Sequence, residues 1–381
     1  MGACGRGTPS VLPALPSSVL SVISVVKCLC IFGASRSYHA PEPARASARG
    51  SECDAMRSDI RYNNIIDSDE AKQAQANADR APEQHHADIN ADTFYITQHY
   101  TKYTRENHDV WRDLFDRRWS VLESQVSGQF IEGMKILRLT RDRLPLLDDL
   151  VLDQDIEVAG GMKLTKGTRL DGINKFLHSV SSWASYGVPG YLPAKAFFAC
   201  LAQREFPTTV LIRPREVMDY LPEPDIFHDV FGHVPLHALR VFADFLQTYG
   251  RASLLCDDPE HIERLGRLFW FTVEFGLIKE DGKVKVYGSG LVSSHAESAY
   301  SLNGVWERTK NGPQSAEPCK ERPVPEWRPF DLERVCETPF EIDHYQPIYY
   351  VLESFEQLRD AMNDYAEKVI GKSGLELATR R

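Results

Sequence analysis

The chain has 381 residues, a formal net charge of −10 and eight cysteines. This length allows one large domain or two modest ones, and an acidic chain lacks the basic surplus that a general nucleic-acid binder needs to neutralise phosphates. Because no Cys-x-x-Cys pair is present, a disulfide scaffold is disfavoured, and we expect a reducing, cytoplasmic compartment.

The first 92 residues are expected to be a disordered leader or arm. Residues 11–34 are apolar, but Lys27 interrupts the run, so no stretch of about 18 apolar residues is present to span a membrane. The excess of basic over acidic residues before Glu52 is typical of a targeting peptide, which would make the location organellar. An unstructured leader, or translation that starts at Met56, is the favoured alternative. Residues 35–92 hold few large apolar side chains, which predicts a flexible arm.

The main domain is expected over residues 93–370, followed by a flexible tail over 371–381. Apolar residues at helical spacing, or short apolar runs, predict helices over 104–125, 128–139, 145–152, 171–180, 194–204, 239–249, 262–278 and 354–369. Short strands are predicted over 156–159, 208–213 and 347–351, and an Asp-Gly turn leads into another over 283–287. The glycines, prolines and charges of 303–328 indicate a surface loop. The fold class is therefore mainly α, with a few short strands. The last helix is too short for a coiled-coil seam, so we expect a monomer.

Residues 222–235 place His228 and His233 five positions apart in a hydrophobic run bounded by prolines. Buried imidazoles are costly unless their ring nitrogens find partners. The segment is therefore either a locally hydrogen-bonded core helix or a metal site. On an α-helix, five residues leave the two side chains about 140° apart, so they converge only if one lies at a helix end, as Gly232 and Pro235 would allow.

Glu274 lies in the middle of 268–278, a segment that is apolar almost all round. A lone buried carboxylate is costly unless a cation meets it. Two histidines and one carboxylate are the ligand set of non-haem Fe(II) sites. Zinc accepts the same set, usually through His-Glu-x-x-His. The residues leave iron and a packed core as even alternatives, and the absence of a His-x-Asp…His order disfavours 2-oxoglutarate oxygenases. Nearby, Gly288-Ser289-Gly290 lacks a third glycine and is not interpreted as a phosphate-binding loop.

Residues 222–235 and 269–277 resemble the signature pair of the pterin-dependent aromatic amino acid hydroxylases. The resemblance covers about residues 100–358, including 338–343 and 349–355. It is closest to the short bacterial phenylalanine 4-monooxygenases, without the regulatory domain and the tetramerisation helix of eukaryotic members. The resemblance implies a single helical catalytic domain.

By position in these motifs, the resemblance implies that His228, His233 and Glu274 are the iron ligands. Arg213, fifteen residues before His228, matches the arginine that pairs with the substrate carboxylate, a task suited to its bidentate geometry. Asp225 matches the aspartate that holds this arginine. Without the resemblance, Arg213 would be interpreted as a surface charge at a strand end.

The resemblance also implies contacts for the amino acid and the pterin. Trp270 matches the aromatic wall of the amino-acid pocket, and Ser293 matches a polar contact near the substrate's main-chain groups. Phe197 matches the ring on which the pterin stacks, and Asp229 would face the pterin side of the iron. The loop whose backbone contacts the pterin edge matches Gly190, Tyr191 and Leu192. From the residues alone, Trp270 and Phe197 would be ordinary core residues.

Two positions and one loop depart from the family pattern. Phe269 stands where many relatives have tyrosine, Leu221 stands where animal members often have threonine, and the 303–328 loop is longer than usual. Phe269 removes one hydroxyl from the rim of the pocket, and Leu221 puts one hydrogen bond to the substrate in question. The longer loop alters the expected access to the site.

The implied activity is hydroxylation of phenylalanine to tyrosine with O2, a tetrahydropterin cosubstrate and Fe(II), without a side chain acting as general base. Tyrosine or tryptophan hydroxylation by the same site is the alternative within the family. A zinc-stabilised protein without catalytic activity is the alternative outside it. The implied partner is a small aromatic amino acid, with no nucleic acid and no membrane.

Overall fold

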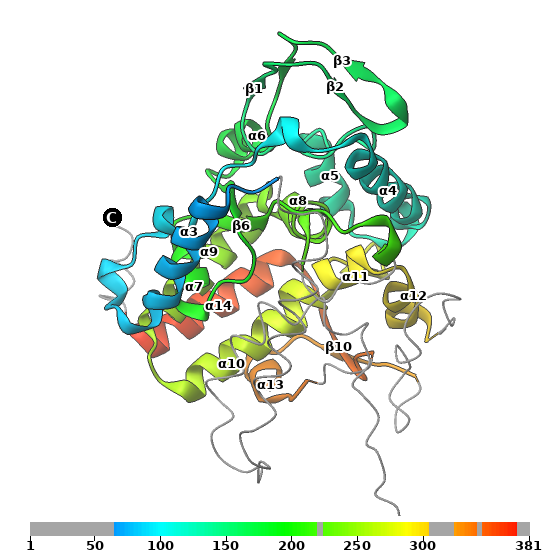
Figure 1. Ribbon diagram of the computed structural model, residues 1–381. Helices are drawn as coiled ribbons and strands as arrows, with labels where there is room; N and C mark the ends of the chain where they lie inside the picture. Colours follow the sequence, from blue (N-terminus) through cyan, green and yellow to red (C-terminus); the bar gives the residue numbers. More distant parts are fainter. Residues whose placement is uncertain (1–64, 219–223, 305–323, 341–344, 372–381) are drawn as a thin grey trace, which may run out of the picture.

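The computed structural model describes residues 65–218, 224–304, 324–340 and 345–371. Helices dominate it and strands are short, which confirms the predicted fold class (Figure 1). The α-helices are α3 (Ser68–Arg80), α4 (Arg105–Gln125), α5 (Gly128–Ile136), α6 (Ile173–Val180), α7 (Ala194–Ala202), α8 (Val234–His237), α9 (Arg240–Leu255), α10 (Pro259–Phe269), α11 (Ser289–Ser293), α12 (His295–Asn303), α13 (Leu332–Glu337) and α14 (Phe355–Ile370). Within the described ranges, no helix is long and apolar enough to cross a membrane.

The largest sheet of the described residues has four strands in the order β8-β7-β10-β9. They are β7 (Leu277–Glu280), β8 (Lys283–Val286), β9 (Glu326–Pro329) and β10 (Ile348–Leu352). β10 is parallel to both of its neighbours, and β7 and β8 form an antiparallel hairpin. Asp281 and Gly282 turn this hairpin with φ of 50° and 73°, as tight hairpin turns require. The predicted Asp-Gly hairpin is therefore confirmed.

The other strands form three two-stranded pairs. β1 (Leu150–Val151) pairs with β4 (Arg169–Leu170), and β2 (Ile156–Glu157) pairs with β3 (Lys163–Leu164), both antiparallel. β5 (Ala184–Val188) runs parallel to β6 (Glu205–Thr209), with α7 between them in the sequence. These short pairs connect helices and do not form a layer of their own (Figure 1).

The helix predicted over 145–152 is wrong. The backbone carbonyls of Leu146 and Leu147 instead accept the N–H groups of Ile173 and Asn174 at 2.8 and 3.0 Å, where α6 begins. The segment is apolar because Leu146, Leu147 and Leu152 are buried in the core, and not because it forms a helix. Residues 262–278 were predicted as one helix, but the helix ends at Glu274, because Leu277 and Ile278 pair with β8 and β10 in the sheet.

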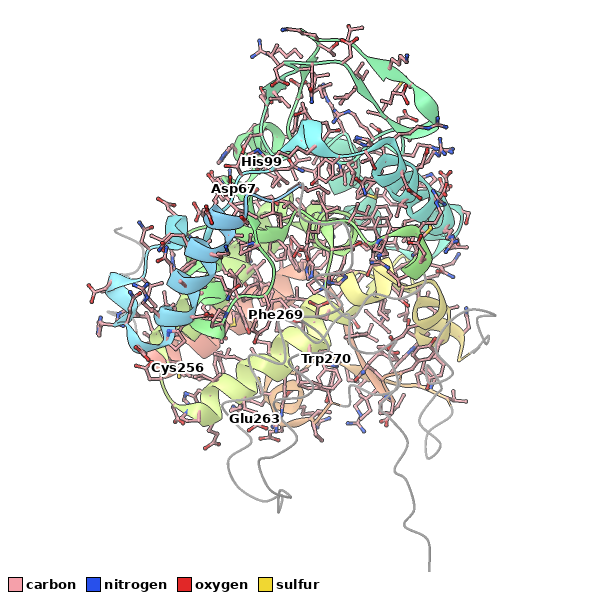
Figure 2. All side chains as sticks on the ribbon, in the orientation of Figure 1. Asp67, His99, Cys256, Glu263, Phe269 and Trp270 are labelled. Carbon is pink, nitrogen blue, oxygen red and sulfur yellow. The ribbon has the colours of Figure 1, made fainter. Side chains whose placement is uncertain are left out.

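The flexible arm expected up to residue 92 is wrong for residues 65–92, which the structure describes. The side chain of Asp67 accepts the N–H groups of Asp69 and Glu70 and caps α3 (Figure 2). Ala74 and Ala78 are buried in the core cluster, and α3 contacts the 3-10 turn Ala91–Phe94. The helix packs through alanines, so its segment lacks the large apolar side chains that predict a buried helix. Residues 1–64 lie outside the described residues.

Two π-helices at the centre of the chain form the framework of the candidate site. η10 (Phe227–His233) runs into α8, and η11 (Trp270–Glu274) continues α10. The short helix α11 contacts both of them. The carboxyl-terminal helix α14 packs against α9, which also packs against α7. Figure 2 shows Phe269 and Trp270 at the junction of α10 and η11.

Candidate metal centre

The π-helical backbone brings His228 and His233 onto one face. A π-helix is bonded i→i+5, and the N–H of Val234 accordingly bonds to the carbonyl of Asp229. Residues five apart therefore lie close together, whereas an α-helix would leave them about 140° apart. Pro235 has no N–H and cannot bond back to Phe231 in the α-helical manner. The sequence predicted that the two histidines converge at a helix end. In the structure they converge because the backbone between them is π-helical.

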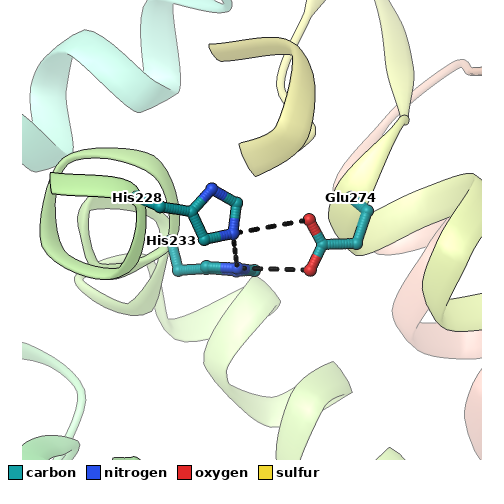
Figure 3. A group of neighbouring side chains, drawn as sticks. All are labelled: His228, His233 and Glu274. Atoms are coloured by element: carbon teal, nitrogen blue, oxygen red, sulfur yellow. Dashed lines mark hydrogen bonds and ion pairs between the residues drawn. The ribbon is translucent and has the colours of Figure 1, made fainter. Parts of the chain in front are cut away.

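Glu274 faces the two histidines from the end of η11 (Figure 3). The Nε2 atoms of His228 and His233 are 3.2 Å apart. Oε1 of Glu274 lies 3.3 Å from Nε2 of His233, and Oε2 lies 3.8 Å from Nε2 of His228. All three side chains are buried.

Two of these three separations fit a shared metal ion. A metal about 2.1 Å from each of two ligand atoms keeps those atoms roughly 3.0–3.4 Å apart when it binds them at 90–110°. The pairs at 3.2 and 3.3 Å meet this condition. Two imidazoles and one carboxylate on one side of an ion leave its other positions open, which is the arrangement of non-haem Fe(II) oxygen-activating sites. Within the described residues, this is the one group of three His, Cys, Asp or Glu side chains placed to hold a metal.

The charge states of these side chains suit metal binding. Burial lowers the pKa of His228 to about 4, so its imidazole is neutral at pH 7. Burial alone would raise the pKa of Glu274, but His233, His228 and a hydrogen bond from Ser289 outweigh it and lower the pKa. The carboxyl group is therefore ionised. Metals bind neutral imidazole and ionised carboxylate.

Two serines of α11 contact the candidate ligands His228 and Glu274. Ser293 donates its hydroxyl to the carbonyl oxygen of Ser289 at 2.8 Å, and its Oγ lies 3.0 Å from Nδ1 of His228. Since the hydroxyl proton is used, Nδ1 carries the proton of this second contact, and Nε2 keeps its lone pair for a metal. Ser289 donates to Oε2 of Glu274 at 2.7 Å. Ser293, predicted to lie near the substrate's main-chain groups, contacts His228. Ser289 was not predicted, because a serine between two glycines carries no signal of a contact with Glu274.

Arg213 and Asp225 form a buried ion pair beside the histidines. Nε and Nη2 of Arg213 donate to the two carboxylate oxygens at 2.8 and 2.9 Å, and its backbone N–H donates at 3.0 Å. Asp225 also accepts the N–H of His228 at 3.0 Å. Burial alone would raise the pKa of Asp225, but Arg213 outweighs it and lowers the pKa. Asp225 thus connects Arg213 to η10 through the N–H of His228.

Aromatic side chains pack next to the candidate centre. Trp270 is fully buried, stacks on Phe340 at 4.5 Å between ring centroids, and donates its Nε1–H to Oε1 of Gln346 at 3.0 Å. Phe206 lies 4.8 Å from the ring of His233. Phe197, on α7, contacts Phe206 edge to face at 6.3 Å. Phe197 also contacts Phe269, the residue before Trp270, at 5.7 Å, and Trp270 and Phe197 belong to the same core cluster.

The remaining predicted residues lie around these elements. Asp229 is buried in η10 and accepts the N–H of Thr209 at 2.7 Å, and burial raises its pKa to about 7. Gly190, Tyr191 and Leu192 connect β5 to α7, the helix of Phe197. Phe269, which carries no hydroxyl, lies 6.5 Å from the ring of His233. Leu221 and residues 305–323 of the predicted long loop lie outside the described residues.

Comparison with known proteins supports the same chemistry. Residues 54–376 match the family model described as biopterin-dependent aromatic amino acid hydroxylase. A phenylalanine-4-hydroxylase of Ralstonia nicotianae is 35% identical over 268 residues, covering 70% of this chain and 72% of that protein. Tyrosine 3-monooxygenase of Bos taurus is 32% identical over 71% of this chain and 47% of its own length.

Solved structures agree with these matches. The phenylalanine hydroxylase of Chromobacterium violaceum with bound iron(III) and 7,8-dihydrobiopterin matches with a TM-score of 0.58 and 32% identity, over 76% of this chain and 90% of that one. The cobalt-bound form of the same enzyme matches with a TM-score of 0.57 and 32% identity, over 75% and 87%.

Proposed function

From the chain's membership of the biopterin-dependent aromatic amino acid hydroxylase family, we propose that His228, His233 and Glu274 hold its catalytic iron. The chain is an aromatic amino acid monooxygenase that converts phenylalanine to tyrosine with O2, a tetrahydropterin and non-haem iron. The observation that carries the proposal is the convergence of three buried ligand atoms from two facing π-helices. Bound iron would supply the oxygen chemistry, with the tetrahydropterin as the source of electrons.

Arg213 is proposed to bind the carboxylate of the amino acid. Its guanidinium is held by Asp225. It also lies 5.9 Å from the ring centroid of Phe227, a residue of the π-helix that carries both histidines. A guanidinium fixed in this way presents a planar donor array without losing side-chain entropy when the substrate binds. The side chain of Arg213 is 12% exposed, so part of it is reachable. The substrate would thus be oriented relative to the metal by its main-chain end.

Trp270 and Phe197 are proposed to form the walls for the amino acid and the pterin, respectively. The hydrogen bond to Gln346 and the stack on Phe340 fix the indole of Trp270. Phe197 is packed between Phe206 and Phe269. The backbone of Gly190, Tyr191 and Leu192 would contact the pterin edge, and Asp229 would face the pterin from η10. Such apolar walls exclude water and strengthen the polar contacts inside.

Turnover of phenylalanine, tyrosine and tryptophan with Fe(II) and tetrahydropterin tests the activity. We expect tyrosine from phenylalanine as the main product. If tyrosine or tryptophan is hydroxylated in preference to phenylalanine, the enzyme is a tyrosine or tryptophan hydroxylase of the same family. The absence of pterin-dependent oxygen uptake with all three would favour the zinc-stabilised alternative.

Glu274→Gln and His228→Ala test the ligand assignment. Each removes one of three ligands, so we expect loss of iron binding and of turnover. Iron content after dialysis and tyrosine formation with added Fe(II) measure the two effects. Full activity in either variant would contradict the assignment.

The assembly, location and extent of the enzyme are also proposed. The apolar face of α14 is covered by α9 of the same chain, which supports a monomer. Cys200, Cys256 and Cys336 are free thiols, which supports a reducing compartment, the cytoplasm. The catalytic unit comprises 93–370 together with the packed residues 65–92. Light scattering and cell fractionation test the first two assignments, and removal of residues 65–92, with a fall in stability expected, tests the third.

A further inference from the structure

The Gly288-Ser289-Gly290 segment meets the backbone of Glu274. A Cβ atom at Gly288 would lie 2.4 Å from the carbonyl oxygen of Glu274, and one at Gly290 would lie 3.0 Å from the same atom. Real Cβ atoms essentially never approach a backbone oxygen as closely as 2.4 Å. Glycine at these positions therefore permits α11 to begin directly against the end of η11. The glycines that did not fit a phosphate-binding loop have this packing function instead.

This approach places the hydroxyl of Ser289 on one oxygen of the metal-binding carboxylate. Ser289 is 1% exposed and donates to Oε2 of Glu274 at 2.7 Å. Its Cβ also packs against Gly232 of η10, where an added Cβ would lie 3.2 Å away. Ser289 is thus wedged between the helix of the two histidines and the helix of the glutamate.

Arg118 holds α11 at its other end. This buried arginine of α4 donates its Nε–H to the carbonyl of Val292 at 2.6 Å and contacts the carbonyl of Leu291 at 3.5 Å through Nη2. Cations at the carboxyl-terminal carbonyls of a helix are stabilising. Ser293 contacts His228 one turn after Ser289, which contacts Glu274. The helix α11 therefore contacts both of the helices that carry the proposed metal ligands.

We propose that Ser289 is a positioning residue that selects Oε1 of Glu274 as the oxygen offered to the metal. The two oxygens of a carboxylate are chemically equivalent until their surroundings distinguish them. A hydroxyl proton on Oε2 reduces its basicity and fixes the rotation of the group, and Oε1 then faces His233 at 3.3 Å. Hydrogen bonds of this kind orient metal ligands and tune the bound ion. The inference rests on the proposed metal centre.

Binding of Co(II) to the metal-free full-length protein tests the inference without turnover. Competition with a chelator gives the Kd, and visible absorption reports the coordination of Co(II). For Ser289→Ala, we expect a Kd roughly 10- to 100-fold weaker than that of the wild type, with an altered Co(II) spectrum. Ser289→Cys has a slightly larger side chain that still donates, though weakly, so we expect a smaller loss. Ser253→Ala is the matched control, because Ser253 is also buried and its hydroxyl has no hydrogen-bond partner in the structure.

The outcomes separate this inference from the metal centre itself. Wild-type protein that fails to bind Co(II) refutes both. Wild-type binding with an unchanged Kd and spectrum in Ser289→Ala overturns only the role of Ser289. An equal loss in Ser253→Ala also overturns it, since the effect would then be general destabilisation. Thermal unfolding of the metal-free variants identifies a folding defect, and if Ser289→Ala does not fold, Ser289→Cys decides in the same way.

Discussion

Asp225→Asn should destabilise the protein strongly and impair binding of the amino acid. The carboxylate accepts four hydrogen bonds of 2.8–3.0 Å, three from Arg213 and one from the N–H of His228. An asparagine keeps one acceptor oxygen, turns an NH2 group toward two of these donors and removes the charge. Arg213 would then be left without its counter-charge in a largely buried position.

Breaking a buried ion pair from one side costs about 3–5 kcal/mol. A loss of about 1 kcal/mol lowers Tm by roughly 2–4 °C in domains of this general size, so we expect Tm to fall by roughly 6–20 °C. The pKa of Asp225 is lowered in the folded protein from its ordinary value of 3.8. The stabilisation is therefore present above that value and is lost as the pH falls through the lowered pKa. The difference in stability between wild type and variant should accordingly narrow below about pH 4.

Thermal unfolding, and KM values for phenylalanine and tetrahydropterin, measure these effects. We expect a higher KM for phenylalanine, because Arg213 loses its orientation, and a smaller change for the pterin. Asp113→Asn is the control, since Asp113 and Arg215 form a partly exposed pair at 2.8 Å that is worth less than about 1 kcal/mol. If Asp225→Asn were no less stable than Asp113→Asn, the reasoning from burial would be refuted.

Three further variants test individual side chains. Arg213→Ala should raise the KM for phenylalanine far more than the KM for tetrahydropterin, and equal effects on both would contradict its assignment to the carboxylate. Phe197→Leu keeps an apolar side chain but removes the stacking ring, so the KM for the pterin should rise while that for phenylalanine changes little; an unchanged pterin KM would speak against stacking. Burial raises the pKa of Glu297 to about 7, so the stability it contributes is present below its ordinary value of 4.5 and is lost as the pH rises through 7. Glu297→Gln should remove this pH-dependent loss of stability, measured as Tm between pH 5 and 8. If Tm depends on pH in the same way in variant and wild type, Glu297 does not titrate in this range.

Helices with a clear apolar stripe and a polar cap were predictable from local sequence. Residues 104–125 and 354–369 were predicted within one residue of α4 and α14. Thr104 and Ser354 accept backbone N–H groups at the starts of these helices, so the signals lie within a few positions of each other. Where the apolar residues serve contacts with distant segments, as over 145–152, the same pattern was misleading.

For the site, the sequence by itself determined the chemical groups of the candidate metal centre: two histidines and a glutamate in an apolar helix. Local pattern left iron and a packed core as even alternatives, and the resemblance in two motifs assigned the residue roles. Only the tertiary structure decided that the ligand atoms meet, because an α-helix keeps His228 and His233 apart and the π-helix brings them together. It also decided that Ser289 contacts Glu274. That hydrogen bond depends on how α11 packs against η11, and no spacing of residues along the chain predicts it.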